Sequence, residues 1–132
     1  MKKIFLLLIC FYVFESSAQK QTYYETVIGK FMKFYNADQA DSICNLFADS
    51  WGKTKATIWK PEDIKELKEK YGAMKSYKYM QMERKSDIAL FKCVFEKTSD
   101  FCMGVSLDKK KKMKTFRFKT ESDYINDLLK KY

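Results

Sequence analysis

The stretch from Met74 to Lys119 constrains the fold more than any other part of the chain. Aromatic, β-branched and methionine side chains alternate there with lysines and small polar residues, which is the period-two pattern of half-buried strands. Turn-like clusters interrupt the pattern at residues 84–87, 97–99 and 109–112. The sequence therefore predicts four strands, at about residues 74–84, 87–97, 100–108 and 112–119. Their connections are too short for parallel crossovers, so we expect an antiparallel meander.

The apolar faces of neighbouring strands also predict their register. A one-residue slip would move every apolar side chain to the other face, so the faces must match. For the last two strands, matching places Val105 opposite Phe116. Met103 then lies opposite Phe118, and residues 109–112 form the loop.

Helical periodicity dominates the residues before the strands. From Gln21 to Tyr35 apolar side chains recur every three or four residues over a wide face, which predicts a helix wrapped by other elements. A shorter helix is expected after Asp38, which can cap it, with Asp41 in its first turn. Pro61 and Gly72 delimit a third helix, because proline suits the first helical position and glycine suits a helix end.

A short helix starting near Thr120 is predicted to follow the strands. Helices followed by strands define an α+β domain. We expect N-terminal helices packed in a curved antiparallel four-strand sheet, a cone-shaped half barrel, with this short C-terminal helix after it. The connector from Asp49 to Trp59 looks irregular, and we expect Trp51, Ile58 and Trp59 to tuck back under the fold.

The first 18 residues have the layout of a secretory signal peptide. Two lysines precede a mostly apolar run, Ile4 to Phe14, and small residues at 16–18 permit cleavage before Gln19. The run is shorter than the roughly 20 apolar residues of a membrane span. A retained anchor and a lipid-modified Cys10 stay open as alternatives, although Cys10 lacks the small preceding residue of a lipobox.

Cleavage there would leave a single domain, residues 19–132, of 114 residues. That length is sufficient to bury one core. The net charge falls only from +9 to +8, because Lys2, Lys3 and Glu15 are removed. We expect a protein exported across the inner membrane, periplasmic or extracellular, with no membrane span after cleavage and no nucleic acid as a partner.

The absence of histidine narrows the chemistry. It removes the usual general base near neutral pH and the commonest metal ligand. Ser-His-Asp and Cys-His arrangements are thereby excluded. The sequence also contains no glycine-rich phosphate loop, no paired cysteines at metal spacing and no calcium-loop spacing. No catalytic residue, no metal site and no cofactor are predicted.

Three cysteines remain after cleavage, and two of them fall on neighbouring strands. An oxidising compartment favours a bridge between Cys93 and Cys102 across their hairpin. The alternation argues against it, because matching apolar faces places Phe95 opposite Phe101. Cys93 then faces the core and Cys102 faces the other way. We therefore expect buried free thiols, Cys44 included, and a bulge in the hairpin leaves the bridge open.

Three segments carry a resemblance to known proteins: Phe34-Tyr35-Asn36-Ala37-Asp38 leading to Ile43-Cys44-Asn45-Leu46-Phe47, the Tyr71-Gly72 helix end, and residues 107–118. They resemble the nuclear-transport-factor-two-like superfamily, to which ketosteroid isomerase-like cones belong. The last segment is similar to a family of uncharacterised secreted bacterial domains, found alone or ahead of serine-hydrolase-type domains. The resemblance covers nearly the whole mature chain. It implies a cone-shaped α+β barrel and frequent dimerisation through the sheet, and no particular activity, because the superfamily holds isomerases, dehydratases and many non-enzymes.

Two groups of residues are candidate functional sites. A pocket inside the cone would be lined by side chains from the sheet and the first helix: Phe31, Tyr35, Phe91, Phe95, Met103, Phe116 and Phe118. The same side chains could equally fill the cone and leave no site. The second group would contact an anionic envelope component or an acidic partner, or else form a solvated turn that blocks edge pairing. It consists of Lys109, Lys110, Lys111, Lys112 and Lys114.

These features favour an exported, non-catalytic module that binds a small apolar ligand or a protein partner. One alternative is a small isomerase- or dehydratase-type enzyme with its site inside the cone, which would need a buried carboxylate as base. Its candidate residues are Tyr77 and Tyr79 for a carbonyl and Asp38, Asp41 or Asp63 for the base. Another alternative is a structural homodimer, whose exposed sheet face would carry Tyr77, Tyr79 and Val94.

Overall fold

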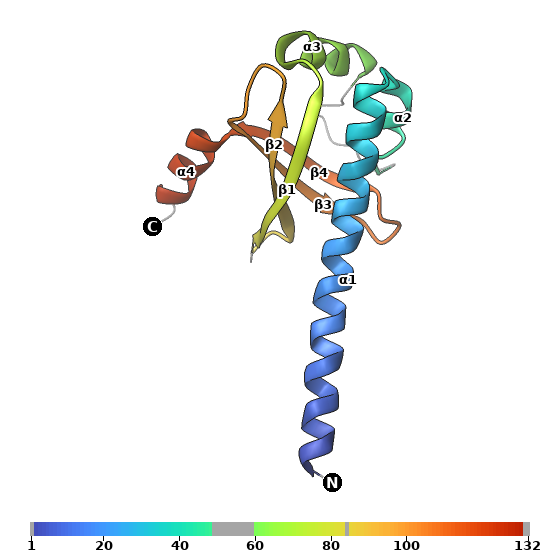
Figure 1. Ribbon diagram of the computed structural model, residues 1–132, viewed down its shortest axis with the longest axis vertical. Coiled ribbons are helices and arrows are strands. Elements are labelled where there is room, and N and C mark those ends of the chain that lie inside the picture. The colour runs from blue at the N-terminus through green and yellow to red at the C-terminus, as the bar shows by residue number, and fades with distance from the viewer. Residues whose placement is uncertain (1, 49–59, 84, 131–132) are drawn as a thin grey trace.

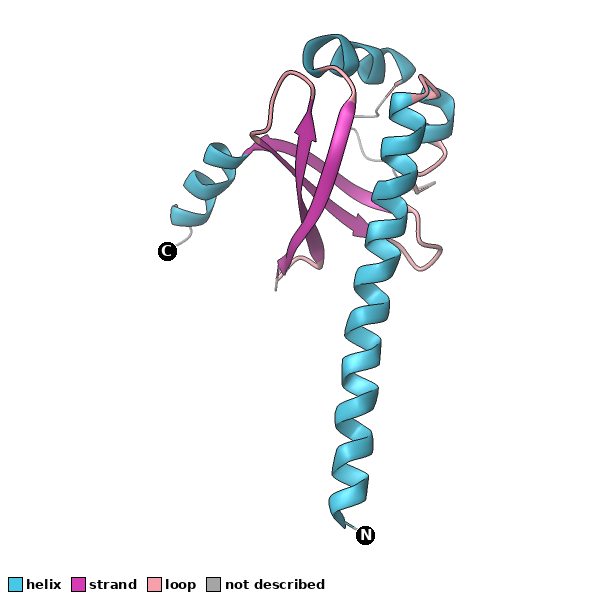
Figure 2. Cartoon of the chain, in the orientation of Figure 1, coloured by secondary structure: helices cyan, strands magenta, loops and turns pink. Residues whose placement is uncertain are grey.

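The computed structural model describes residues 2–48, 60–83 and 85–130. Within these residues the chain forms three helices, then a run of strands, then a final helix (Figure 1). In chain order the elements are α1 (Lys2–Asn36), α2 (Ala40–Cys44), α3 (Pro61–Tyr71), β1 (Met74–Glu83), β2 (Ile88–Phe95), β3 (Phe101–Leu107), β4 (Met113–Thr120) and α4 (Glu121–Leu129). Figure 2 shows the strands gathered in one sheet that separates α4 from α1. The predicted connector and its tryptophans lie outside the described residues.

Helix α1 is longer than the sequence pattern predicts. It begins at Lys2 rather than near Gln21 and runs as one helix through the predicted cleavage site. No proline or glycine occurs before Gly29, so nothing in the sequence of this segment breaks the helix. Four residues of its predicted apolar face are buried, Val27, Ile28, Phe31 and Tyr35. Tyr24, one turn earlier, is buried as well. Among the described residues, no helix combines the length and hydropathy that a membrane span requires.

The junction between α1 and α2 corrects the role predicted for Asp38. The residue ends α1 rather than capping α2: its backbone is left-handed, with φ of 58°, and the N–H of Gln39 donates to the carbonyl of Phe34 at 2.9 Å. This is the geometry of a Schellman helix end. The N-cap of α2 is Gln39, which makes no side-chain cap bond.

Helix α3 has the predicted bounds. Pro61 occupies the first turn and Gly72 is the C-cap, with φ of 75°. Asp63 lies in the first turn, where its carboxylate accepts the N–H of Lys60 at 2.7 Å. The proline and glycine signals were therefore sufficient to predict both ends of this helix.

The sheet has the order β1-β2-β3-β4, with antiparallel neighbours throughout. The predicted α+β fold is confirmed, and the sheet is open rather than curled into a closed cone. The predicted β3–β4 pairs are also confirmed, since Val105 lies opposite Phe116 and Met103 opposite Phe118.

The predicted β2–β3 register is wrong by two residues. Phe101 lies opposite Cys93 rather than Phe95, so the connecting loop is longer than expected. Backbone hydrogen bonds hold the end of β2 against the start of β1: Glu96 N–H donates to the Ala73 carbonyl at 2.9 Å. A shift of two keeps every side chain on its predicted face, so the alternation alone could not detect it.

The cysteine prediction is confirmed for the two strand residues. Cys93 and Cys102 are buried free thiols, and Cys44 is half-buried. Cys102 lies opposite Lys92 while Cys93 lies opposite Phe101, so the two thiols are on opposite faces of the sheet. Burial raises the pKa of Cys93 to about 12, so this thiol is a core side chain rather than a nucleophile.

Candidate functional site

Most of the predicted pocket-lining residues lie in the hydrophobic core, where they contact one another. The ring of Phe31 lies 5.4 Å from that of Phe116, and the ring of Phe95 lies 5.6 Å from that of Phe118. Phe118 is half-buried, whereas the other six are buried: Phe31, Tyr35, Phe91, Phe95, Met103 and Phe116. These contacts fill the space between α1 and the sheet. A ligand would therefore reach this aromatic group only where part of it faces solvent.

A cavity of about 450 Å³ lies where the aromatic core meets α4. We call it the α4 cavity. Its walls come from the end of α3, the paired ends of β3 and β4, and one face of α4. The lining residues are Tyr71, Phe101, Phe118, Lys119, Thr120, Asp123, Asn126 and Lys130.

Three aromatic rings form the floor of the α4 cavity. The ring of Phe101 lies 4.5 Å from that of Tyr71, at an interplanar angle of 73°, and 4.5 Å from that of Phe118. Phe95 lies behind them, 6.0 Å from Phe101, and joins the floor to the core. Tyr71 and Phe118 are half-buried, so their ring surfaces are accessible from the cavity. Floor rings held in such edge and tilted contacts are fixed in position before any ligand arrives.

Polar side chains from β4 and α4 form the rim. Asp123 and Asn126 are three residues apart and therefore lie on one face of α4, with Lys130 one turn further on. Lys119 contributes from the end of β4. The rim thus places two ammonium groups, an amide and a carboxylate around an apolar floor.

The first turn of α4 is fixed to the sheet by three polar contacts. The Thr120 hydroxyl accepts the N–H of Asp123 at 3.2 Å, as an N-cap does. The Asp100 carboxylate accepts the N–H of Glu121 at 3.2 Å, and the Glu121 carboxylate pairs with Lys92 at 2.8 Å. These contacts set the distance between the rim of α4 and the aromatic floor.

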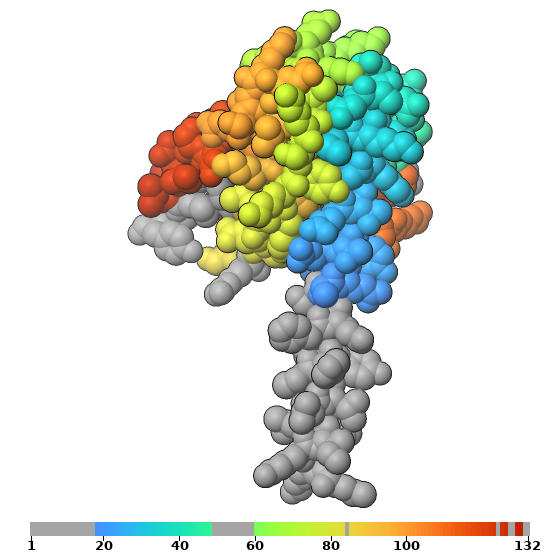
Figure 3. All heavy atoms as spheres, viewed as in Figure 1, coloured from blue at the N-terminus to red at the C-terminus, as the bar shows by residue number. Residues whose placement is uncertain are grey.

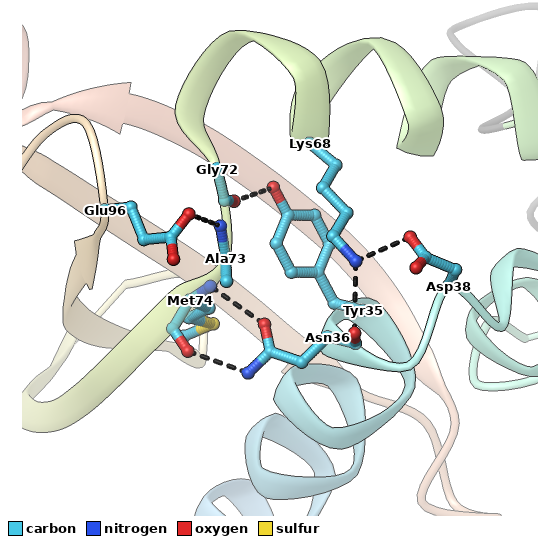
Figure 4. A network of polar contacts seen from close by, with 8 residues as sticks. All are labelled: Tyr35, Asn36, Asp38, Lys68, Gly72, Ala73, Met74 and Glu96. Carbon is cyan, nitrogen blue, oxygen red and sulfur yellow. Dashed lines mark hydrogen bonds and ion pairs between the residues drawn. The ribbon is translucent and has the colours of Figure 1, made fainter.

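A second cavity, of about 370 Å³, lies between the end of α1, α2 and α3. Three of its polar side chains, Tyr35, Asp38 and Lys68, are already paired within the chain (Figure 4). Lys68 donates to the Asp38 carboxylate at 2.5 Å and to the Asn36 carbonyl at 3.1 Å. The buried Tyr35 hydroxyl donates to the Gly72 carbonyl at 2.9 Å, and burial raises the pKa of this tyrosine above its usual value. This arrangement joins elements of the fold, so these three side chains serve the structure of the domain.

The residues proposed for the enzyme alternative do not come together. Tyr77 and Tyr79 share one strand face, as predicted, but that face packs on the core, with their rings 6.1 and 5.6 Å from Phe91. The three candidate carboxylates lie elsewhere: Asp41 is exposed, Asp63 serves as a cap, and the Asp38 side chain is 76% exposed. None of these three is the desolvated base that the enzyme alternative requires.

The predicted dimer face is wrong in its composition. Tyr77 and Tyr79 pack against the core, whereas Ser76 lies opposite Val94 on the other face of the sheet. A β1 bulge near Met80 further separates the face positions. The two tyrosines therefore cannot form one exposed patch together with Val94.

Two side chains of the predicted lysine group, Lys111 and Lys112, make contacts within the chain. Lys112 donates to the Asn45 carbonyl, and the ammonium of Lys111 lies 4.2 Å from the ring centre of Tyr23. Lys109, Lys110 and Lys114 are exposed. Sequence reasoning did not identify Tyr23 as a neighbour of this loop, because the contact depends on how α1 crosses the sheet.

The α4 cavity was missed as a site for a related reason. The alternation placed Phe101 and Phe118 on the core face, but it could not show that the core opens at their end of the sheet.

Among the residues that the structure describes, no three His, Cys, Asp or Glu side chains are grouped so as to hold a metal ion.

Fold and cavity together define an open-sheet α+β domain with an aromatic-floored cavity beside its last helix. Comparison with protein families, with curated proteins and with solved structures finds no match to this chain.

Proposed function

We propose that the chain is an exported, non-catalytic binding module of the cell envelope, with the α4 cavity as its ligand site. The observation that carries the proposal is the aromatic floor of Tyr71, Phe101 and Phe118 beneath a charged rim. Small-molecule sites are typically concave, about 300 to 1,000 Å³ in volume, and combine apolar walls with a few polar groups. Export rests on the predicted signal peptide.

The cavity favours a small ligand with an apolar, preferably planar, body and a polar end. The body would lie against the half-buried rings of Tyr71 and Phe118. The polar end would meet the rim, where Lys119 and Lys130 suit a carboxylate or phosphate and Asn126 can donate or accept. Binding rather than catalysis is proposed because the rim carboxylate, Asp123, is exposed and therefore lacks the desolvation that makes a carboxylate a useful base.

The test is native mass spectrometry of the processed protein purified from the envelope of a bacterium that expresses the full chain. We expect a bound small molecule that is released on denaturation. Asn126→Trp would fill the cavity from an exposed helix position without altering the core, and this variant should carry no bound mass. Ser122→Trp places the same side chain on the same helix, at an exposed position outside the lining, and should retain the ligand.

Thermal-shift screening with aromatic carboxylates and fatty acids extends the test to weak ligands that purification removes. A compound that stabilises the wild type and Ser122→Trp but not Asn126→Trp supports the proposal. Equal binding by both variants would place the ligand elsewhere. No bound mass and no stabilising compound would refute the ligand site.

A second candidate function is self-association through α4. Ile125 and Leu129 on this helix are 48% and 70% exposed, which is unusual for large apolar side chains. A second copy of the chain would offer an apolar contact for these two side chains, and the homodimer proposal now rests on α4 rather than on the sheet tyrosines.

A further inference from the structure

One end of the domain collects three segments that are distant in the sequence. Both hairpin tips, β1–β2 and β3–β4, point toward the end of the body from which α1 protrudes (Figure 1). At this end Lys20 of α1 pairs with Asp87 of the β1–β2 hairpin at 2.6 Å, and the Tyr24 hydroxyl donates to the Asp87 carbonyl at 3.2 Å. The β3–β4 hairpin contacts α1 through Lys111 and Tyr23. We call this surface the basic end; it comprises Lys20, Tyr23, Lys85, Lys109, Lys110 and Lys111.

The basic end carries a net positive charge, because its five lysines outnumber the nearby carboxylates Asp87, Asp108 and Glu83. Asp87 is paired with Lys20, and Asp108 is used inside its own hairpin, where its carboxylate accepts the N–H groups of Lys110 and Lys112 at 2.8 and 2.9 Å. Lys85, Lys109 and Lys110 are exposed, and within the described part of the chain none of their ammonium groups has a hydrogen bond or ion pair. In the space-filling view the first coloured residues of α1, drawn in blue, lie between atoms of the two hairpins (Figure 3).

The β3–β4 tip is held in a defined conformation. The N–H of Asp108 donates to the Lys112 carbonyl at 2.8 Å, and the N–H of Lys111 donates to the Asp108 carbonyl at 3.0 Å. Lys111 adopts a left-handed backbone, with φ of 62°, which turns the chain between Lys110 and Lys112. Lys112 anchors the loop to the Asn45 carbonyl. The exposed lysines are therefore presented from a fixed loop, at little further cost in conformational entropy on binding.

We propose that the basic end docks on the anionic phospholipid headgroups of a bilayer. The occupant is inferred from the position of α1: this helix leaves the body at the basic end, and the residues that precede Gln19 are the predicted signal peptide. The basic end is therefore the part of the body nearest the predicted signal peptide, and its excess of lysines complements the charge of anionic headgroups. Tyr23, 38% exposed beside Lys111, supplies the aromatic group that interfacial surfaces commonly carry next to basic residues.

The proposal rests on the export part of the proposed function and is independent of the α4 cavity. Binding of this kind should be electrostatic, with each lysine near an anionic surface contributing about a fivefold factor in affinity. Added salt should weaken it, because the Debye length is only about 8 Å at physiological ionic strength. A ligand in the α4 cavity should leave it unchanged, so failure of one proposal does not imply failure of the other.

The experiment is co-sedimentation of the processed protein, expressed from the full chain, with two kinds of vesicle. One is phosphatidylcholine alone, and the other is phosphatidylcholine mixed with phosphatidylglycerol. The test variant is Lys85→Gln, Lys109→Gln and Lys110→Gln together. The control is Lys33→Gln, Lys65→Gln and Lys75→Gln, which removes the same charge from exposed lysines at the end of α1, on α3 and at the start of β1.

We expect the wild type and the control to bind the anionic vesicles, and the test variant to bind them about a hundredfold more weakly. The substitutions should change neither the secondary structure nor the stability measured in the absence of vesicles, because the substituted side chains are exposed. Melting curves of the wild type and both variants check this. Equal losses in both variants would mean that net charge alone acts, and would overturn the proposal. It is also overturned if the wild type fails to bind, binds neutral vesicles equally well, or loses no affinity on the test substitutions.

Discussion

At the residue scale, the fold depends strongly on the conformation of Gly72. This residue ends α3 with a positive φ of 75°, and its carbonyl accepts the Tyr35 hydroxyl. A Cβ at this position would lie 2.6 Å from a carboxylate oxygen of Glu96 and 2.8 Å from the Glu96 Cβ. Both the backbone and the surrounding atoms therefore select glycine.

We predict that Gly72→Ala lowers the free energy of unfolding by about 2 to 3 kcal/mol, through backbone strain and the clash with Glu96. Urea denaturation measures the change. The control is Gly29→Ala in α1, where a Cβ would approach only the Tyr77 side chain, at 3.0 Å from its hydroxyl. That variant should change the stability by less than about 1 kcal/mol. Equal effects of the two substitutions would contradict the role of the positive φ.

Cys93 should make the protein sensitive to alkaline pH. Its pKa rises from 9.0 to about 12 on folding, mainly because burial disfavours the thiolate. A folded-state pKa above the unfolded value stabilises the fold fully below pH 9, and this stabilisation is lost as pH rises toward 12. The loss should reach about 1.5 kcal/mol near pH 10. In urea titrations across this range, the unfolding free energy of Cys93→Ala should fall less steeply with pH than that of the wild type. Cys44→Ala, at a half-buried site, should alter this pH dependence less. A pH dependence of Cys93→Ala equal to that of the wild type would exclude the effect.

At the element scale, Asn36 joins the end of α1 to the start of β1. Its side-chain oxygen accepts the N–H of Met74 at 2.9 Å, and its amide donates to the Met74 carbonyl at 2.8 Å (Figure 4). The pair imitates one rung of a strand ladder.

We predict that Asn36→Ala costs about 1 to 3 kcal/mol in unfolding free energy, because both Met74 backbone groups lose their partner. Asn36→Asp should cost at least as much, since a carboxylate would still accept the N–H but would face the Met74 carbonyl with an unfavourable charge. Gln39→Ala, three residues away, removes an exposed amide that caps nothing and should have little effect. Thermal denaturation compares the three, and a harmless Asn36→Ala would show that water replaces the amide.

The elements themselves were largely predictable, and the physical reasons differ between them. Pro61 and Gly72 act through backbone geometry that does not depend on the rest of the fold, so both ends of α3 were predicted. Side-chain alternation predicted each strand to within about two residues and fixed which face each side chain occupies. It could not fix the β2–β3 register, because a shift of two preserves the faces. It also could not show that Asp38 ends one helix instead of starting another, since aspartate suits both positions.

The candidate site was harder to predict than the elements. Alternation placed Phe118 on the face that forms the α4 cavity, but it gave equal weight to Phe31 and Phe91, which are fully buried. Whether an aromatic face is covered depends on where α4 turns after β4, and that is set by the contacts of Asp100 and Glu121. Such contacts join residues about twenty positions apart and leave no periodic pattern in the sequence.

At the scale of the whole molecule, three surfaces have separate proposed roles. The α4 cavity is lined by the start of β3 and the end of β4, which is the opposite end of these strands from the β3–β4 tip. The basic end lies where α1 leaves the body (Figure 1). The exposed side chains of α4, Ile125 and Leu129, are neither cavity-lining nor part of the basic end. Ligand binding, membrane docking and self-association can therefore be removed one at a time by surface substitutions.

Self-association through α4 is the last of these predictions. Sedimentation velocity of the processed wild type should show a monomer at low loading and a dimer at high loading, because burying Ile125 and Leu129 removes apolar surface from water. Ile125→Glu with Leu129→Glu should remain monomeric throughout, since the added charges would be buried unpaired. Ser122→Glu with Asn126→Glu adds the same charge to the same helix at exposed polar positions and should weaken the dimer far less. A wild type that is monomeric at every loading would refute the homodimer, and would leave the apolar residues of α4 exposed for a different partner.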